Sequence, residues 1–119
     1  MRRLKPKTLE LTESDKAREA GQILAKIGAS DLVIALDERG DAPSSVTFAK
    51  LFAKAEETSR NIIVIIGGPD GLHESVRQRA NHVICFGAMT WPHQLVRVLL
   101  AEQLYRAETI LNGHPYHRV

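Results

Sequence analysis

The sequence predicts an α/β domain in which a mostly parallel sheet is flanked by helices on both faces. Strand-like apolar runs alternate with segments of helical periodicity, which is the pattern of strands joined by crossover helices. Two of these runs, DLVIALD (31–37) and NIIVIIGG (61–68), are apolar without alternation, as expected of strands buried on both faces. The length of 119 residues, 44% of them apolar, suits a single domain over residues 1–119 with one core.

The first half of the chain is expected to hold two strands and two helices. Pro6 confines the first strand to a sheet edge or a strand start. Gly28 ends the first helix, and the breaker-rich segment ERGDAP (38–43) ends the second strand. Ser44 or Ser45 caps the second helix. The four predicted elements are a strand within 4–11, a helix over 13–27, a strand over 31–37 and a helix over 44–58.

The second half continues the alternation and closes with a long helix. The expected elements are a strand over 61–68, a helix over 72–80, a strand over 82–86 and a helix over 92–111. Apolar side chains cover most of the circumference of this last helix, at positions 95, 96, 98, 99, 100, 104 and 107. Such coverage predicts burial on two sides, which a second copy of the chain would explain.

Composition limits the classes of function. The net charge of +2 is compatible with a nucleic-acid partner but does not imply one. A single cysteine, Cys85, excludes an internal disulfide and fits a reducing cytosol, and it is expected to be a buried small side chain in mid-strand. No signal peptide, membrane-spanning run or metal-ligand spacing is found. We therefore expect a soluble, cytoplasmic protein that needs no metal and no membrane.

Three strand ends are expected to form a ligand site. In open α/β sheets, ligands bind outside the carboxyl ends of the strands. These ends are Leu36-Asp37, the glycine-rich segment 67–71 and the segment 86–91, and they should converge on one rim. The segment 67–71 lacks the glycine spacing of dinucleotide folds and the Lys-Ser/Thr of P-loops, which argues against nicotinamide cofactors and ATP. Taken alone, it is either a turn or a binding loop.

Two further segments can be interpreted either as purely structural or as functional. The loop 86–92 carries the only tryptophan of the sequence, Trp91. Trp91 either packs in the core or in a dimer interface, or it lines a purine-binding site. The tail HPYHRV (114–119) is either a solvated terminus or a docked segment with proton-transfer and phosphate-contacting groups. Glu102 and Arg106, four residues apart on the last helix, are expected to form at least a surface pair.

Four motifs, in order and spacing, resemble one known family. LVIALDERG, VIIGGPDGL, FGAMTWPHQLVRVLLAEQLYRA and the terminal HPYHR are similar to the RlmH-type ribosomal large-subunit pseudouridine methyltransferases, which belong to the SPOUT class. The resemblance runs from about Leu32 to the C-terminus, and EAGQILAKI (19–27) also resembles the family's preceding helix. It implies a trefoil knot in the C-terminal half, formed by the loop and helix after Phe86. It also implies a homodimer packed through the knotted regions.

The resemblance further implies methyl transfer from S-adenosylmethionine to N3 of a pseudouridine in 23S rRNA, on assembled ribosomes. The implied cofactor-binding residues are Leu36, Gly67, Phe86, Gly87, Ala88, Met89, Thr90 and Trp91. In-line transfer from a sulfonium requires an acceptor nitrogen stripped of its proton. The implied catalytic residues are His117, Tyr116 and Arg118 from the tail, with Arg106 and His93 orienting them or contacting the RNA. Which group acts as the base stays open.

One departure and two alternatives accompany this interpretation. Family members begin with a further strand and helix that this chain is expected to lack, which suggests a less stable relative or a degenerate one that binds cofactor without modifying ribosomes. A receiver domain phosphorylated on Asp37 would need an acidic pair after its first strand and a late lysine, and neither is present at a matching place. A ribosome-binding protein without catalytic activity is the other alternative.

Overall fold

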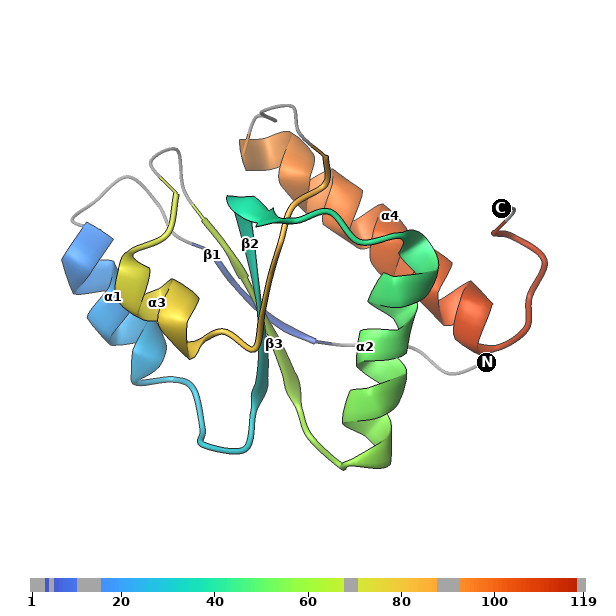
Figure 1. Cartoon of the computed structure of the whole chain (residues 1–119), viewed down its shortest axis with the longest axis horizontal. Coiled ribbons are helices and arrows are strands. Elements are labelled where there is room, and N and C mark those ends of the chain that lie inside the picture. Colours follow the sequence, from blue (N-terminus) through green and yellow to red (C-terminus); the bar gives the residue numbers. More distant parts are fainter. Residues whose placement is uncertain (1–3, 5, 11–15, 68–70, 88–92, 118–119) are drawn as a thin grey trace.

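A computed structural model describes residues 4, 6–10, 16–67, 71–87 and 93–117, which form a four-stranded sheet with four helices (Figure 1). The strand order is β1-β3-β2-β4, and every pairing is parallel. This confirms the predicted fold class. The elements are β1 (Lys7–Glu10), α1 (Lys16–Leu24), β2 (Leu32–Asp41), α2 (Ser45–Glu57), β3 (Ile62–Ile66), α3 (Glu74–Arg79), β4 (His82–Ile84) and α4 (His93–Leu111).

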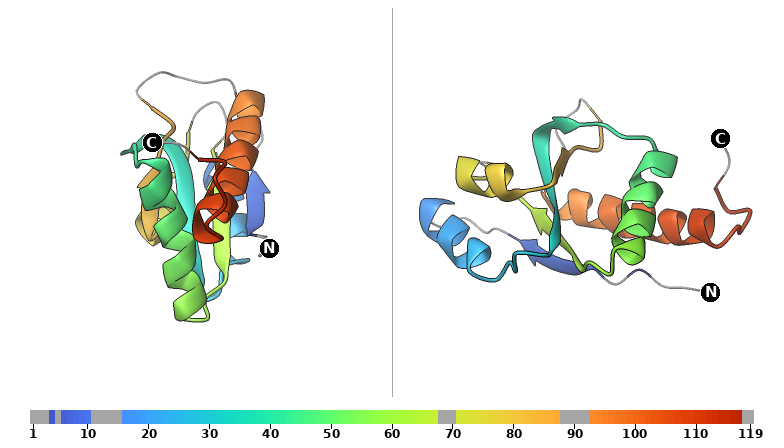
Figure 2. Two further views of the ribbon diagram at one scale, coloured as in Figure 1. Left: turned by 90° about the vertical axis from the view of Figure 1, so that its right-hand side faces the viewer. Right: turned by 60° about the horizontal axis from the view of Figure 1, so that its bottom comes forward.

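Helices cover both faces of the sheet. Figure 2 shows α1 and α3 on one side and α2 with α4 on the other. Successive side chains of a strand point to opposite faces, so Ile34 packs under α2 and α4 while Val33 and Ala35 pack toward α1 and α3. All five residues of β3 are buried, as the run of β-branched residues predicts.

The predicted end of the second strand is wrong. The segment 38–43 does not end β2 at Asp37, because β2 continues to Asp41 across an irregularity in its pairing with β4. The backbone N–H of Cys85 donates to the carbonyl of Asp41 at 2.9 Å. A Cβ on Gly40 would lie 2.5 Å from the backbone of Val83 and Ile84. Glycine here allows two strands to approach closely rather than breaking one.

The predicted length of the fourth strand and the predicted burial of Cys85 are also wrong. Only His82–Ile84 pair as β4, and of these Ile84 alone is buried, because β4 lies at an edge of the described sheet. Cys85 therefore lies just after the strand and is half-buried, where a buried mid-strand residue was expected. The edge position predicted for β1 is confirmed.

The helix boundaries follow local hydrogen-bonding signals. Ser44 caps α2, since its side chain accepts the N–H of Thr47, and the helix ends at the predicted place. α1 ends at Leu24, three residues before the predicted end, because Ile27 donates to Leu24 in a tighter turn.

The long helix α4 has almost the predicted bounds. Within the described ranges, no helix is both long and apolar enough to cross a membrane. The trefoil knot expected from the resemblance depends on the loop after Phe86, and residues 88–92 of that loop lie outside the described residues. The knot therefore stays a prediction.

Candidate functional site

Two of the three predicted rim segments meet. The N–H of Gly67 donates to the carbonyl of Leu36 at 3.3 Å, and the N–H of Leu72 donates to Oδ2 of Asp37 at 3.0 Å. These contacts follow from the register of β2 and β3, in which Leu36 lies opposite Ile66. The carboxyl ends of these two neighbouring strands therefore form one surface, as predicted.

Gly67 is a position where a side chain has little room. A Cβ there would lie 3.2 Å from Cγ of Leu72, 3.3 Å from the carbonyl carbon of Gly71 and 3.4 Å from the carbonyl oxygen of Leu36. Its neighbour Gly71 has φ +76°, a conformation that favours glycine. The absence of a side chain at Gly67 thus lets its backbone pack against Leu36, Gly71 and Leu72, at the end of β2.

Asp37 is a structural carboxylate. Its side chain is fully buried, and it accepts the N–H of Leu72 with one oxygen and the N–H of Arg39 with the other, the latter at 2.9 Å. Nη1 of Arg77 lies 3.9 Å from Oδ2. These partners occupy both oxygens, which argues against the receiver-domain alternative, where this carboxylate would have to be reachable by a phosphoryl donor.

The third predicted segment begins beside a cavity of about 330 Å³, which we call the α2–α4 cavity. Its lining includes Ala42, Ser45, Phe48, Phe86, Leu99 and Gln103, together with Gly87. Leu36 and Gly67 do not line this cavity, so the predicted cofactor residues divide between the rim and the cavity wall. Ala88, Met89, Thr90 and Trp91 lie outside the described residues.

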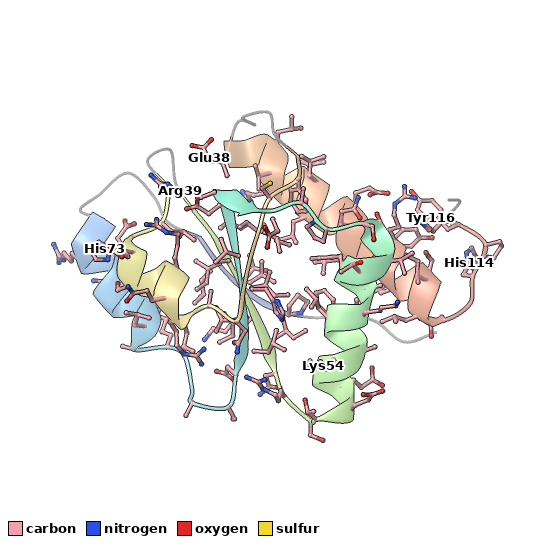
Figure 3. The ribbon with its side chains drawn as sticks, in the orientation of Figure 1. Glu38, Arg39, Lys54, His73, His114 and Tyr116 are labelled. Carbon is pink, nitrogen blue, oxygen red and sulfur yellow. The ribbon has the colours of Figure 1, made fainter. Side chains whose placement is uncertain are left out.

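The C-terminal tail is docked against α4. Nη2 of Arg106 donates to Oε1 of Glu102 at 2.8 Å, the hydroxyl of Tyr116 donates to the same oxygen at 3.1 Å, and Nη1 of Arg106 lies 3.0 Å from Nδ1 of His117. The ring of Tyr116 packs edge-on against Tyr105 at 4.9 Å and lies 5.0 Å from the guanidinium of Arg106. Figure 3 shows Tyr116 beside the C-terminal half of α4. We call Glu102, Arg106, Tyr116 and His117 the tail cluster.

Charge and hydrogen bonding define the protonation of the tail cluster. The hydrogen bond from Arg106 lowers the pKa of Glu102, which therefore stays ionised at neutral pH. The hydrogen bond to Glu102 raises the pKa of Tyr116, so its hydroxyl keeps its proton. A guanidinium only donates, so Nδ1 of His117 accepts and the ring proton lies on Nε2. In this arrangement the cluster presents a cation and a ring N–H donor.

The predicted catalytic residues are not all brought together within one chain. His93 begins α4 and Arg106 lies 13 residues later, about 20 Å further along the helix axis. Figure 1 shows the N-terminal end of α4 near the rim and its C-terminal end, with the tail, far from it. Arg118 lies outside the described residues. The tail cluster and the rim of one chain therefore lie apart, and the resemblance implies that the tail serves the cofactor site of a partner subunit.

Contacts of two residues of the site were missed by sequence reasoning. The predicted surface pair of Glu102 with Arg106 is confirmed, but the further contacts of Glu102 with Tyr116 and the side-chain amide of Gln103 were not predicted. Ser45, expected only as a possible helix cap, donates its hydroxyl to Oε1 of Gln103 at 2.8 Å. Spacing on one helix reveals the first pair, but no sequence signal joins α2 to α4 across 58 residues.

Comparison with known proteins identifies the family. A family model described as "Predicted SPOUT methyltransferase" matches residues 2–117. Proteins named "Ribosomal RNA large subunit methyltransferase H" from Rhizobium leguminosarum bv. trifolii and Rhizobium etli are 51% and 52% identical over 108 residues, which cover 90% of this chain and 68% of each relative. A protein of that name from Acidiphilium cryptum is 53% identical over 103 residues, or 87% of this chain and 65% of the relative. The chain belongs to the SPOUT methyltransferase family.

Proposed function

We propose that this protein methylates 23S rRNA of the large ribosomal subunit, at N3 of a pseudouridine, with S-adenosylmethionine as methyl donor. Relatives at about half identity bear the name of a large-subunit rRNA methyltransferase, and the aligned region covers 90% of the chain. The observation that carries the proposal is the packing of Gly67 against Leu36 and Leu72, which brings the carboxyl ends of β2 and β3 together on one surface. This is the rim where open α/β sheets bind ligands.

The described residues fit the proposed cofactor. Leu36 and Gly67 would hold it at the rim together with Phe86 and Gly87, while Ala88, Met89, Thr90 and Trp91, which the resemblance also implies, lie outside the described residues. The absence of a side chain at Gly67 keeps the ends of β2 and β3 close together, and Phe86 adds an aromatic ring where the third rim segment begins. When bound, S-adenosylmethionine supplies a methyl group on a positively charged sulfur.

The tail cluster would prepare the acceptor base. Transfer to N3 requires that this nitrogen lose its proton, and cationic or N–H donor groups near the base lower its pKa, so that the proton can leave to solvent water before the methyl group is transferred. Arg106 supplies a fixed positive charge, and His117 supplies the Nε2 proton that its contact with Arg106 dictates. Tyr116 holds the tail in place through Glu102 and Tyr105.

A homodimer would bring the tail cluster of one chain to the rim of the other. Four large apolar side chains are exposed on the described surface: Leu95 (39%), Val98 (62%), Tyr105 (46%) and Tyr116 (42%). The first three recur at helical spacing on α4, and Tyr116 packs against Tyr105. An apolar stripe that surrounds the tail cluster is suited to cover by a second copy.

The test measures binding and methylation separately. Titration calorimetry of the chain with S-adenosylhomocysteine should show binding that Gly67→Val abolishes, because the added side chain would enter the space between Leu36 and Leu72. The matched control is Gly21→Val, since nothing lies within 4 Å of a Cβ at Gly21. Its binding should equal that of the unmodified chain.

Methylation is measured on ribosomes that lack the modification, by mass spectrometry of the digested 23S rRNA. Incorporation at N3 of a pseudouridine would support the proposal, and incorporation at another position would contradict its specificity. A folded chain that binds ribosomes but neither the cofactor nor its product would favour the alternative, a relative without catalytic activity.

A further inference from the structure

The α2–α4 cavity combines one apolar and one polar wall. Its volume of about 330 Å³ lies in the range of about 300–1,000 Å³ that holds small molecules. The aromatic rings of Phe48 and Phe86 and the side chain of Leu99 form the apolar part. Phe48 is 3% exposed and packs edge-on against Phe52 at 5.2 Å, so the core holds it in place. Phe86 is half-buried and is therefore the aromatic ring on which a planar base could stack, while Phe48 supports the floor of the cavity from the core.

The polar wall is a hydrogen-bonded pair of defined orientation. Oε1 of Gln103 accepts the hydroxyl proton of Ser45 at 2.8 Å, and Nε2 of Gln103 donates to Oε2 of Glu102 at 3.3 Å. A carboxylate only accepts, so the amide nitrogen must face Glu102. One N–H of the amide and the lone pairs of the Ser45 oxygen then stay available to a ligand. This donor beside an acceptor matches the C2 carbonyl and the adjacent N1–H of a pseudouridine, an edge whose recognition leaves N3 open to the methyl donor.

The cavity touches both parts of the proposed active site. Phe86 and Gly87 line it and are the first residues of the segment proposed to hold the cofactor. Through Glu102, the polar wall also connects with Arg106 at 2.8 Å and hence with the tail cluster. A base in this cavity would therefore lie beside Phe86 and Gly87, the described residues of the proposed cofactor segment, while the tail cluster of the partner chain would reach the same rim in the proposed homodimer.

We propose that the α2–α4 cavity receives the uracil-type base that is methylated, with Ser45 and Gln103 recognising its edge. The proposal rests on the proposed function and adds a place for the acceptor base. Enzymes that modify a base commonly take it out of the stack into a closely fitting pocket, where hydrogen bonds read its edge. Ser45 and Gln103 become specificity-determining residues in this proposal.

Two kinds of variant test the proposal. Gln103→Leu keeps the approximate volume of the side chain and removes its donor and acceptor, while Ala42→Trp fills the cavity from an exposed wall position. Either change should lower kcat/KM for ribosomes lacking the modification by about 10- to 100-fold, as expected for a lost buried hydrogen bond. The affinity for S-adenosylhomocysteine should not change. The control is Gln78→Leu, the same replacement at an exposed site on α3, which should retain full activity.

A double variant tests whether the two residues act together. Ser45→Ala should lower kcat/KM as well. The double variant with Gln103→Leu should have the same kcat/KM as the less active of the two single variants, because the hydroxyl of Ser45 orients the amide of Gln103. Additive losses would overturn the claim that they read the base as one unit.

The outcomes separate this proposal from the proposed function. Full activity of both Gln103→Leu and Ala42→Trp would overturn the base pocket and leave the methyltransferase function intact. Loss of S-adenosylhomocysteine binding in these folded variants would also overturn it, because the cavity would then hold the cofactor. A chain that neither binds S-adenosylhomocysteine nor methylates ribosomes would overturn both.

Discussion

At the scale of single residues, Glu102 organises the functional end of α4. It accepts from Arg106, Tyr116 and Gln103, and thereby connects the tail with the α2–α4 cavity. The hydrogen bonds from Arg106 and Tyr116 lower the pKa of Glu102 and favour its ionised form. Several side chains are positioned by this one residue, so its removal should alter all of them.

The pKa of Tyr116 reports whether Glu102 holds the Tyr116 hydroxyl in solution. Its hydrogen bond to Glu102 raises its pKa in the folded protein, so Glu102→Gln should lower that pKa toward the ordinary value of about 10. Absorbance of tyrosinate during alkaline titration, in a Tyr105→Phe background, reports Tyr116 as the remaining tyrosine. An unchanged midpoint would show that the two side chains do not interact in solution.

Glu102 should also give stability a pH dependence at acid pH. Its pKa is lowered in the folded protein, mainly by the hydrogen bond from Arg106. Its contribution is therefore present above the unfolded pKa of about 4.3 and is lost as the pH falls through the folded pKa. Urea unfolding from pH 6 to 3 should show a shallower decline in Glu102→Gln. The difference should shrink in high salt, because this pair is solvent-exposed.

At the scale of elements, the contact between β2 and β4 depends on Gly40. A Cβ there would lie 2.5 Å from backbone atoms of Val83 and Ile84, which cannot move as a flexible side chain would. The contact also positions Phe86, because β4 leads directly to it. Gly40 therefore affects the cavity indirectly, because it sets the position of β4 and so of Phe86 in the cavity wall.

Gly40→Ala should lower the free energy of unfolding by about 1–3 kcal/mol, the usual cost of forcing extra volume into a packed site. Gly21→Ala is the control, because it lies in α1 with open space around it. It should raise stability by about 0.5–1 kcal/mol, since alanine favours helix over glycine. Urea denaturation of the three proteins measures both changes. Equal stability of all three would contradict the close approach.

The connection between the end of β2 and the loop before α3 depends on Asp37. Its buried carboxylate accepts the backbone N–H groups of Leu72 and Arg39. Asp37→Asn replaces one accepting oxygen by a donor, which leaves a buried N–H unpaired. It should cost about 1–3 kcal/mol of unfolding free energy, measured in urea. Asp41→Asn, at an exposed position of the same strand, should have little effect.

At the scale of the whole molecule, the arrangement of site residues suits a dimer. The rim lies near the start of α4 and the tail cluster near its end, while the exposed stripe of Leu95, Val98 and Tyr105 lies on the helix between them. Packing of two such stripes would bury apolar surface and place the tail of each chain against its partner.

Val98 is the most exposed of these side chains at 62%, and in the proposed dimer Val98→Asp would bury a charge in the interface, so the variant should be monomeric. Sedimentation velocity measures the change in mass. Gln22→Asp adds the same charge on the exposed side of α1 and should leave the dimer intact. A monomeric starting protein would contradict the dimer directly.

The sequence by itself determined the order of strands and helices, the parallel sheet and the family. Continuous β-branched runs such as 62–66, helical periodicity in α4 and the Ser44 cap are local signals, because the chemistry of neighbouring residues is enough to produce them. The meeting of Leu36 with Gly67 also followed, since parallel strands end at one edge of a sheet.

Only the tertiary structure decided the extension of β2, the edge position of β4 and the pairing of Ser45 with Gln103. Each depends on segments far apart in the chain: Gly40 approaches Ile84, and α2 contacts α4. In the sequence, a segment such as 38–43 is the same whether its glycine ends a strand or lets a neighbouring strand approach closely. Long-range packing selects between these outcomes, and so it decided where the cavity and the tail cluster lie.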